Sequence, residues 1–195
     1  MKIEVPEFIR GLIFDCDGTL VDSMPLHIKA WEFAITDSGL NWDFEFFDSK
    51  KGMPSNEILE LYSKHYNADI NIDKVLKTKY DYFYKHRTEF KPIEHVVDIV
   101  FEYKDKLPMS VASGGSRKTV NVQLDDLGIR HLFKAIITAD DNLKSKPAPD
   151  MFLEAARRMN VEPQFCQVFE DGEFGLEAAR KAGMLATDIR LFNSE

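Results

Sequence analysis

The chain has 195 residues, with 25 Lys and Arg against 33 Asp and Glu and a formal net charge of −8. Hydrophobic residues make up 44% and charged residues 30% of the sequence, a balance that is typical of globular proteins and excludes disordered and fibrous classes. The excess of acid argues against a nucleic-acid partner, because phosphate backbones bind basic surfaces. No apolar run approaches the ~20 residues needed to span a bilayer.

The first predicted strand covers residues 8–14 and stops at Asp15. A short apolar run that ends in acid and glycine is typical of a buried parallel strand leading into a functional loop. Similar runs follow at 109–112, 135–138, 167–169 and 185–189. Helix-like stretches lie between them at 96–106, 116–127, 149–159 and 174–182. This alternation predicts an α/β fold with a doubly wound parallel sheet, whose ligands bind beyond the carboxyl ends of the strands.

Residues 25–90 interrupt this alternation, because they contain helical periodicity and no convincing strand. The helices predicted there are 25–38 with Pro25 in its first turn, 55–66 with Ser55 as its N-cap, and 73–88 behind an Asp cap at Asp73. We therefore expect an all-helical insertion between the first strand and the rest of the sheet. Residues 91–93 are the expected return hinge.

The most informative motif is Asp15-Cys16-Asp17-Gly18-Thr19, directly after the first strand. Alternation along an extended chain turns Asp15 and Asp17 to the same side. Two close carboxylates repel each other unless a cation or a shared proton joins them. For this stretch alone, an ordinary turn rich in Asp and Gly is the alternative.

Three further clusters follow the later predicted strands. Ser113 and Gly114 open a Ser/Gly turn that could bind phosphate, Lys146 lies on a proline-rich loop, and Glu170 with Asp171 forms a second acid pair. Taken singly, these are a common turn, a solvated lysine and a helix cap. Together they place hydroxyl, ammonium and carboxylate groups, in order, at strand ends that should meet.

With these four motifs in order, the sequence resembles the haloacid dehalogenase-like phosphohydrolases that carry a small helical cap, over nearly the whole chain. The motifs of the resemblance are Asp15-x-Asp17-Gly18-Thr19, Ser113, Lys146 within Lys-Pro-Ala-Pro-Asp, and Glu170-Asp171. The resemblance implies a Rossmann-like catalytic core of residues 1–22 and 92–195, with a helical cap domain of residues 23–91 inserted after the first motif.

The chemistry of phosphate esters agrees with these residues. Phosphate monoesters hydrolyse extremely slowly, and the attacking group must approach a dianion. Mg2+ held by a few carboxylates suits that task. We expect Asp15 to be the nucleophile and a metal ligand, forming an aspartyl-phosphate, and Asp17 to be the general acid and base. Asp171 is the expected second metal carboxylate, supported by Glu170, and the resemblance adds the Asp17 backbone carbonyl as a ligand.

The phosphoryl oxygens are expected to be stabilised by Lys146 and Ser113. Residues 22–27, with Trp31, resemble the branch of the family that acts on sugar phosphates. The candidate substrate-binding residues are Thr19, His27, Gly52, Ser55, Lys79, Gly114 and Arg117. A packed helix histidine is the ordinary alternative for His27, and a solvated helix lysine is the alternative for Lys79.

The predicted function is a phosphatase for a small sugar phosphate of the fructose-1-phosphate kind. The runner-up is a mutase like β-phosphoglucomutase, in which an arginine grips the second phosphate at the position of Ser55 in this chain. A hydroxyl cannot replace that bidentate charged contact, so the phosphatase is favoured. The remoter alternatives are a phosphoacceptor domain and a catalytically silent phosphate-binding protein.

The sequence opens at Met1 without an apolar signal region, so we expect no export and a cytoplasmic location. Cys16 and Cys166 are then expected to be free thiols. The expected partner is a small-molecule phosphate ester, without membrane or nucleic acid, and the chain is expected to be a monomer.

Overall fold

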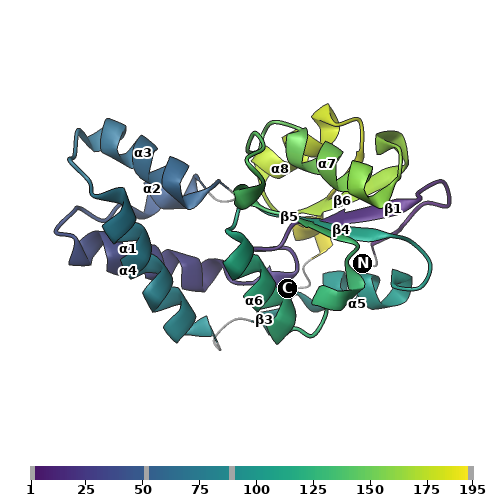
Figure 1. Cartoon of the computed structure of the whole chain (residues 1–195), viewed down its shortest axis with the longest axis horizontal. Helices are drawn as coiled ribbons and strands as arrows, with labels where there is room; N and C mark the ends of the chain where they lie inside the picture. Colours follow the sequence, from purple (N-terminus) through teal and green to yellow (C-terminus); the bar gives the residue numbers. More distant parts are fainter. Residues whose placement is uncertain (1–2, 51–52, 88–90, 193–195) are drawn as a thin grey trace.

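The computed structural model describes residues 3–50, 53–87 and 91–192 and consists of two bodies (Figure 1). One is a parallel sheet covered by helices, drawn on the right, and the other is built only of helices, drawn on the left. The sheet has the strand order β5-β4-β1-β6-β7. The strands are β1 (Gly11–Phe14), β4 (Met109–Ala112), β5 (Ala135–Ile137), β6 (Cys166–Glu170) and β7 (Leu185–Asp188).

Helices cover both faces of this sheet (Figure 1). They are α5 (Glu94–Tyr103) and α6 (Arg117–Asp126) on one face, and α7 (Asp150–Met159) and α8 (Glu173–Lys181) on the other. Short 3-10 turns occur at Arg130–Leu132, Ala139–Asp141, Pro163–Phe165 and Ile189–Phe192. The predicted doubly wound sheet is confirmed, since every pair of neighbouring strands in it is parallel.

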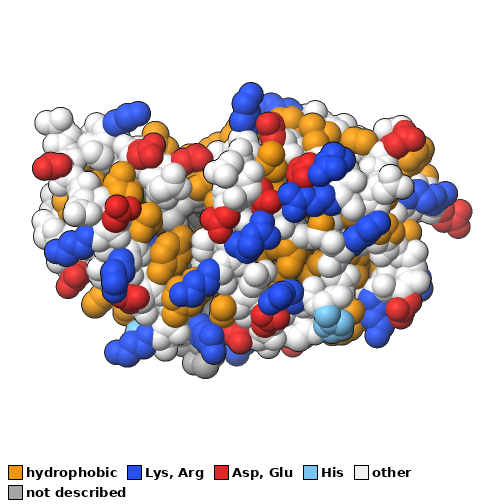
Figure 2. Space-filling view, viewed as in Figure 1, with side chains coloured by type: hydrophobic (Ala, Val, Ile, Leu, Met, Phe, Trp, Pro, Cys, Tyr) orange, Lys and Arg blue, Asp and Glu red, His pale blue; other side chains and the backbone are white. Residues whose placement is uncertain are grey.

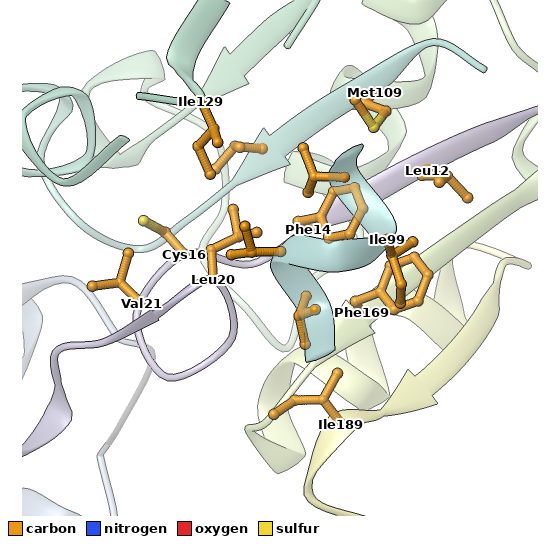
Figure 3. Packing of buried hydrophobic residues seen from close by; sticks show 14 of the residues in the cluster. Leu12, Phe14, Cys16, Leu20, Val21, Ile99, Met109, Ile129, Phe169 and Ile189 are labelled. Atoms are coloured by element: carbon orange, nitrogen blue, oxygen red, sulfur yellow. The ribbon is translucent and has the colours of Figure 1, made fainter. Parts of the chain in front are cut away.

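The two faces follow from the alternation of side chains along β1. Leu12 and Phe14 belong to the apolar cluster beneath α5 and α6, whereas Ile13 belongs to the cluster beneath α7 and α8. In the first cluster, the rings of Phe14 and Phe169 stack with centroids 4.7 Å apart (Figure 3). All four residues of β1 are buried, so the strand that carries the first motif is anchored from both sides.

The helical segment between β2 (Val21–Asp22) and β3 (Lys91–Pro92) contains α1 (Met24–Asp37), α2 (Phe44–Asp48), α3 (Ser55–Tyr66) and α4 (Ile72–Lys85). Its core gathers Trp31, Phe47, Leu59 and Tyr62, among others. None of the helices in the described part of the chain has the length and apolar character needed to cross a bilayer.

Three local predictions for this segment are corrected. Pro54, and not Ser55, is the N-cap of α3. Asn71, and not Asp73, caps α4, because its side chain accepts a hydrogen bond from the Lys74 N–H. The expected hinge at 91–93 is in part a strand: β3 pairs antiparallel with β2, so the two crossings between the bodies lie side by side.

Charges of both signs are interspersed over the face of the molecule that Figure 2 shows. Cys16 and Cys166 are buried free thiols, as the sequence predicts. A concentration of one sign of charge lies instead inside the molecule, where β1 and β6 end.

Candidate active site

The carboxyl ends of β1, β4 and β6 bring the four predicted motifs together. Asp15 directly follows β1, Ser113 follows β4, and Glu170 is the last residue of β6. Lys146 arrives from the loop between β5 and α7. Because parallel strands end at the same edge of a sheet, motifs that are far apart in the sequence meet here.

Lys146 is the centre of the contacts at this edge. Its ammonium donates to Asp15 Oδ1 at 2.6 Å and to Glu170 Oε1 at 2.5 Å. The lysine is only 2% exposed, so the solvated-lysine alternative is wrong. Burial opposes its charge, but Asp15 and Glu170 outweigh burial and raise the pKa of Lys146. The side chain is therefore a permanent cation in a closed site.

Two glycines make room for the acidic side chains. A Cβ on Gly175 in α8 would lie 1.8 Å from Glu170 Oε1, and a Cβ on Gly18 would lie 2.3 Å from Asp171 Oδ2. Gly18 also has a φ of +89°, in the left-handed region that favours glycine. Glycine at both positions is therefore a requirement of the carboxylate cluster.

Asp15, Glu170 and Asp171 form that cluster, with one oxygen from each within 4.8 Å of the others. Burial raises the pKa of Asp15; the Lys146 ammonium opposes this shift, and Glu170 and Asp171 add to it. Burial and then the charge of Glu170 raise the pKa of Asp171 to about 7. Three carboxylates against one ammonium leave negative charge that a divalent cation would neutralise, so the donor set fits Mg2+.

Asp17 faces a different set of partners. Its Oδ1 accepts hydrogen bonds from Ser23 Oγ at 2.6 Å, Gln123 Nε2 at 2.6 Å and His27 Nε2 at 2.9 Å. Burial would raise the pKa of Asp17, but His27 and the three hydrogen bonds outweigh it and hold that pKa well below its usual range. Burial lowers the pKa of His27, with Asp17 opposing. His27 also stacks on Phe83 at 4.3 Å between ring centroids, so it is a packed helix residue; its contact with substrate stays a prediction.

A cavity that is partly open to solvent lies between the sheet and the helical segment, and its empty space, including the open part, is about 610 Å³. The predicted site residues that line it are Asp15, Asp17, His27, Ser55, Lys79, Ser113 and Gly114. A second, smaller cavity, about 260 Å³ including its open part, reaches Asp15 and Asp17 from the side of Lys146, Glu170 and Asp171. The two aspartates of the first motif therefore separate an acidic compartment from a larger one beneath the helices.

The far end of the larger cavity belongs to the helical segment. Lys79 is 3% exposed, so the solvated-lysine alternative is wrong here too. Its ammonium donates to Ser55 Oγ at 2.9 Å and lies 4.6 Å from the centre of the Trp31 ring. Burial lowers the pKa of Lys79 to about 8, with Asp17 opposing. Lys50 also lines the cavity, although no motif in the sequence marks it.

Three other predicted substrate residues are placed differently. Thr19 Oγ1 donates to Asp171 Oδ1 at 3.1 Å, and Thr19 does not line either cavity. The Arg117 guanidinium donates to Asp141 Oδ2 at 2.5 Å and to the Ile136 carbonyl, outside the lining of the larger cavity. Gly52 lies outside the described residues.

Sequence reasoning did not find Ser23 and Gln123, two of the three side-chain partners of Asp17. Ser23 occupies the N-cap position of α1, where a serine ordinarily indicates only a helix start. Gln123 lies on the buried face of α6 with Thr119, Val120 and Leu124. A polar side chain on the inner face of an amphipathic helix is the signal that could have found it.

Comparison with known proteins identifies the architecture. A family model described as haloacid dehalogenase-like hydrolase matches residues 12–188, which span the sheet and the helical segment. The chain belongs to this family. The predicted Rossmann-like fold and the predicted haloacid dehalogenase-like enzyme are thereby confirmed.

Relatives in this family have more than one activity. Fructose-1-phosphate phosphatase YqaB of Escherichia coli (strain K12) is 38% identical over 185 residues, covering 95% of this chain and 98% of that protein. β-Phosphoglucomutase of Bacillus subtilis (strain 168) is 27% identical, covering 93% and 83%. The crystal structure of CbbY from Rhodobacter sphaeroides in complex with phosphate has a TM-score of 0.82 at 26% identity, covering 91% of this chain and 84% of that chain. The roles of single residues in this haloacid dehalogenase-like chain stay predictions.

Proposed function

We propose that this chain is a Mg2+-dependent phosphatase that hydrolyses a small sugar phosphate of the fructose-1-phosphate kind through an aspartyl-phosphate on Asp15. One observation carries the proposal: Asp15 lies between an acidic compartment suited to a cation and a larger cavity suited to a small organic group. In this proposal residues 1–22 and 92–195 are the catalytic core, and residues 23–91 are a cap domain that recognises the substrate.

The first step is the transfer of the phosphoryl group to Asp15. Lys146 holds Oδ1 of Asp15, so the other carboxylate oxygen attacks phosphorus while the bond from phosphorus to the ester oxygen breaks. Asp17 gives its proton to the departing alcohol. In the second step, Asp17 takes a proton from a water molecule whose oxygen attacks the phosphoryl group, which restores the Asp15 carboxylate and releases inorganic phosphate.

The low pKa of Asp17 in the free site has a consequence for this cycle. Asp17 is ionised at neutral pH before the substrate binds, so it must acquire its proton as the ester arrives. An anionic phosphoryl group beside Asp17 raises the pKa of that carboxyl by charge repulsion. Substrate binding therefore favours the protonated acid that the leaving alcohol needs.

Asp15 and Asp171 are the residues that would hold Mg2+, with Glu170 in support. Bound there, Mg2+ supplies positive charge to the oxygens of the phosphoryl group. Lys146 adds an ammonium on the same side of the cluster. Ser113 Oγ accepts a hydrogen bond from the Gly115 N–H at 3.0 Å, which orients its own proton for donation to a phosphoryl oxygen.

A phosphosugar mutase is the second candidate, and one observation favours it. Lys50 and Lys79 both line the cavity from the helical segment, and their ammonium groups would attract a second phosphate. Against it, Ser55 takes the position of the mutase arginine, and its hydroxyl accepts from Lys79 and Tyr80. Neither ammonium can form the bidentate contact of a guanidinium, so the phosphatase remains the better proposal.

A screen of sugar phosphates with measurement of released inorganic phosphate tests the proposal. We expect release in the presence of Mg2+, loss of release when a chelator such as EDTA removes the metal, and recovery when Mg2+ is added back in excess. Adding a hexose bisphosphate should not increase the rate. A bisphosphate-primed isomerisation without net hydrolysis would contradict the phosphatase, and full activity in EDTA would contradict the metal requirement.

Lys79 predicts a pH dependence of substrate binding. Because burial lowers its pKa to about 8, the ammonium is present below pH 8 and loses its charge as the pH rises through that value. A lost charge-assisted hydrogen bond corresponds to roughly a tenfold rise in KM. Steady-state kinetics between pH 6.5 and 9.5 check this. In Lys79→Met we expect a KM that is high and independent of this ionisation. If KM of the Lys79→Met variant rose with pH as in the wild type, Lys79 would be excluded as the cause of the pH dependence.

A further inference from the structure

Gln123 is a buried polar residue on the inner face of α6, and both ends of its amide are occupied. Its Nε2 donates to Asp17 Oδ1 at 2.6 Å, and its Oε1 accepts from the Cys16 thiol at 3.3 Å. The glutamine is fully buried, so water does not compete for these contacts. The three residues form a chain of hydrogen bonds from thiol to amide to carboxylate.

The two carboxylate oxygens of Asp17 have different surroundings. Oδ1 receives all three donors described above, which saturates it. Asp17 Oδ2 lies beside Gly115, where a Cβ would approach that oxygen to 3.3 Å. Gly115 and Asp17 both line the larger cavity. A proton carried by Asp17 is therefore excluded from Oδ1 and belongs on the oxygen next to the cavity.

Gln123 differs from the other two donors in its origin. Ser23 and His27 belong to the start of α1, in the helical segment, whereas Gln123 comes from the sheet body that also carries Asp15. It is thus the side-chain donor that fixes Asp17 relative to the expected nucleophile. The Gln123 amide can also flip by rotation about its last side-chain bond, and its carbonyl oxygen would then face Asp17 Oδ1 and repel it.

Asp17 and the Cys16 thiol both favour the productive direction of that amide. The ionised Asp17 carboxylate can only accept, so it requires the Nε2 end of Gln123, and the protonated thiol adds a weak hydrogen bond to the Oε1 end. We propose that Gln123 is a positioning residue that keeps Asp17 Oδ2 directed at the leaving oxygen, and that the Cys16 thiol stabilises the direction of its amide. This inference rests on the proposed function, because it requires Asp17 to be the general acid.

The test compares two esters that differ in their need for an acid. A hexose phosphate leaves as a strongly basic alkoxide unless it is protonated, whereas p-nitrophenolate leaves without a proton. General acid catalysis is worth roughly 10²–10⁴-fold. For Gln123→Met and Gln123→Glu, we expect kcat/KM to fall at least about tenfold more with the hexose phosphate than with p-nitrophenyl phosphate. The parameter kcat/KM is chosen because it reports the phosphoryl transfer to Asp15.

Leu124→Val is the matched control for Gln123. Leu124 is equally buried on the same face of α6, but its side chain makes no hydrogen bond. Its substitution should therefore change kcat/KM by the same factor with both esters. An equal loss with both esters in the Gln123 variants overturns the positioning role and leaves the phosphatase intact. If the wild-type protein hydrolyses neither ester, the proposed function itself fails, and the inference fails with it.

A pair of substitutions at Cys16 keeps the test decisive if the Gln123 variants do not fold. Cys16→Ser retains a donor beside Gln123 Oε1, and Cys16→Ala removes it. We expect kcat/KM of Cys16→Ala to fall more with the hexose phosphate than with p-nitrophenyl phosphate. In Cys16→Ser we expect this difference to disappear. Equal behaviour of the two variants overturns the role of the thiol. A crystal structure of Gln123→Met in which Asp17 keeps the same rotamer overturns the role of the amide without reference to activity.

Discussion

Asp15→Asn is expected to lower phosphate release by about 10⁴-fold or more while the fold is retained. An amide is a poor nucleophile, so the variant cannot form the phosphorylated side chain that the proposed mechanism requires. Turnover of a sugar phosphate in the presence of Mg2+ measures the loss. Mass spectrometry of acid-quenched protein should show a phosphoryl adduct on Asp15 in the wild type and none in the variant.

The stability of Asp15→Asn separates a chemical defect from a structural one. The substitution keeps the shape of the side chain and removes one of three clustered carboxylates, whose mutual repulsion contributes to the raised pKa of Asp15. The thermal midpoint without metal should therefore not fall below that of the wild type. Asp98→Asn, at an exposed position of α5, is the control and should retain full activity. Substantial turnover by Asp15→Asn would contradict the nucleophile assignment.

Lys146→Met is expected to reduce both stability and activity. It removes the ammonium from Asp15 and Glu170 and leaves buried carboxylates without this cation. Breaking a buried ion pair on one side costs about 3 kcal/mol of unfolding free energy or more. The loss of one stabilising charge at the phosphoryl group should lower kcat by about 10²–10³-fold. Urea denaturation without metal and steady-state kinetics with Mg2+ measure the two effects.

Lys144→Met is the matched control for Lys146. Lys144 lies two residues earlier on the same loop but is exposed, so its charge should contribute little to either quantity. Mg2+ should restore part of the stability of Lys146→Met, because a bound cation compensates the same carboxylates. Equal unfolding free energies for the two variants would refute the assignment of Lys146 as the cation that stabilises this cluster.

The sheet was predictable because its strands are buried on both faces. Such strands are short apolar runs, and the motifs follow them directly. The predicted runs at 109–112 and 135–138 therefore agree closely with β4 and β5. The same logic brought Lys146 and Glu170 to Asp15, since parallel strands share one edge. The meeting of the four motifs at one edge of the sheet therefore followed from their order along the chain.

Elements without a local pattern were missed. The helix α2 has five residues, too few to show a helical period, and it depends on the Asp43 cap and on Phe47 packing between Trp31 and Trp42. The two-residue strands β2 and β3 pair across the whole helical segment, so neither leaves a signal in its own sequence. Contacts made only by the tertiary fold were likewise invisible, as for Gln123 beneath Asp17.

The pairing of β2 with β3 has an evolutionary consequence. Val21 lies opposite Pro92 and Asp22 opposite Lys91, so the helical segment leaves and re-enters the sheet body at adjacent points. A segment with adjoining ends can grow, shrink or be exchanged while the strands beside Asp15 keep their places. Evolution can therefore change the side chains around Lys79 in different lineages while the residues at the strand ends beside Asp15 stay the same.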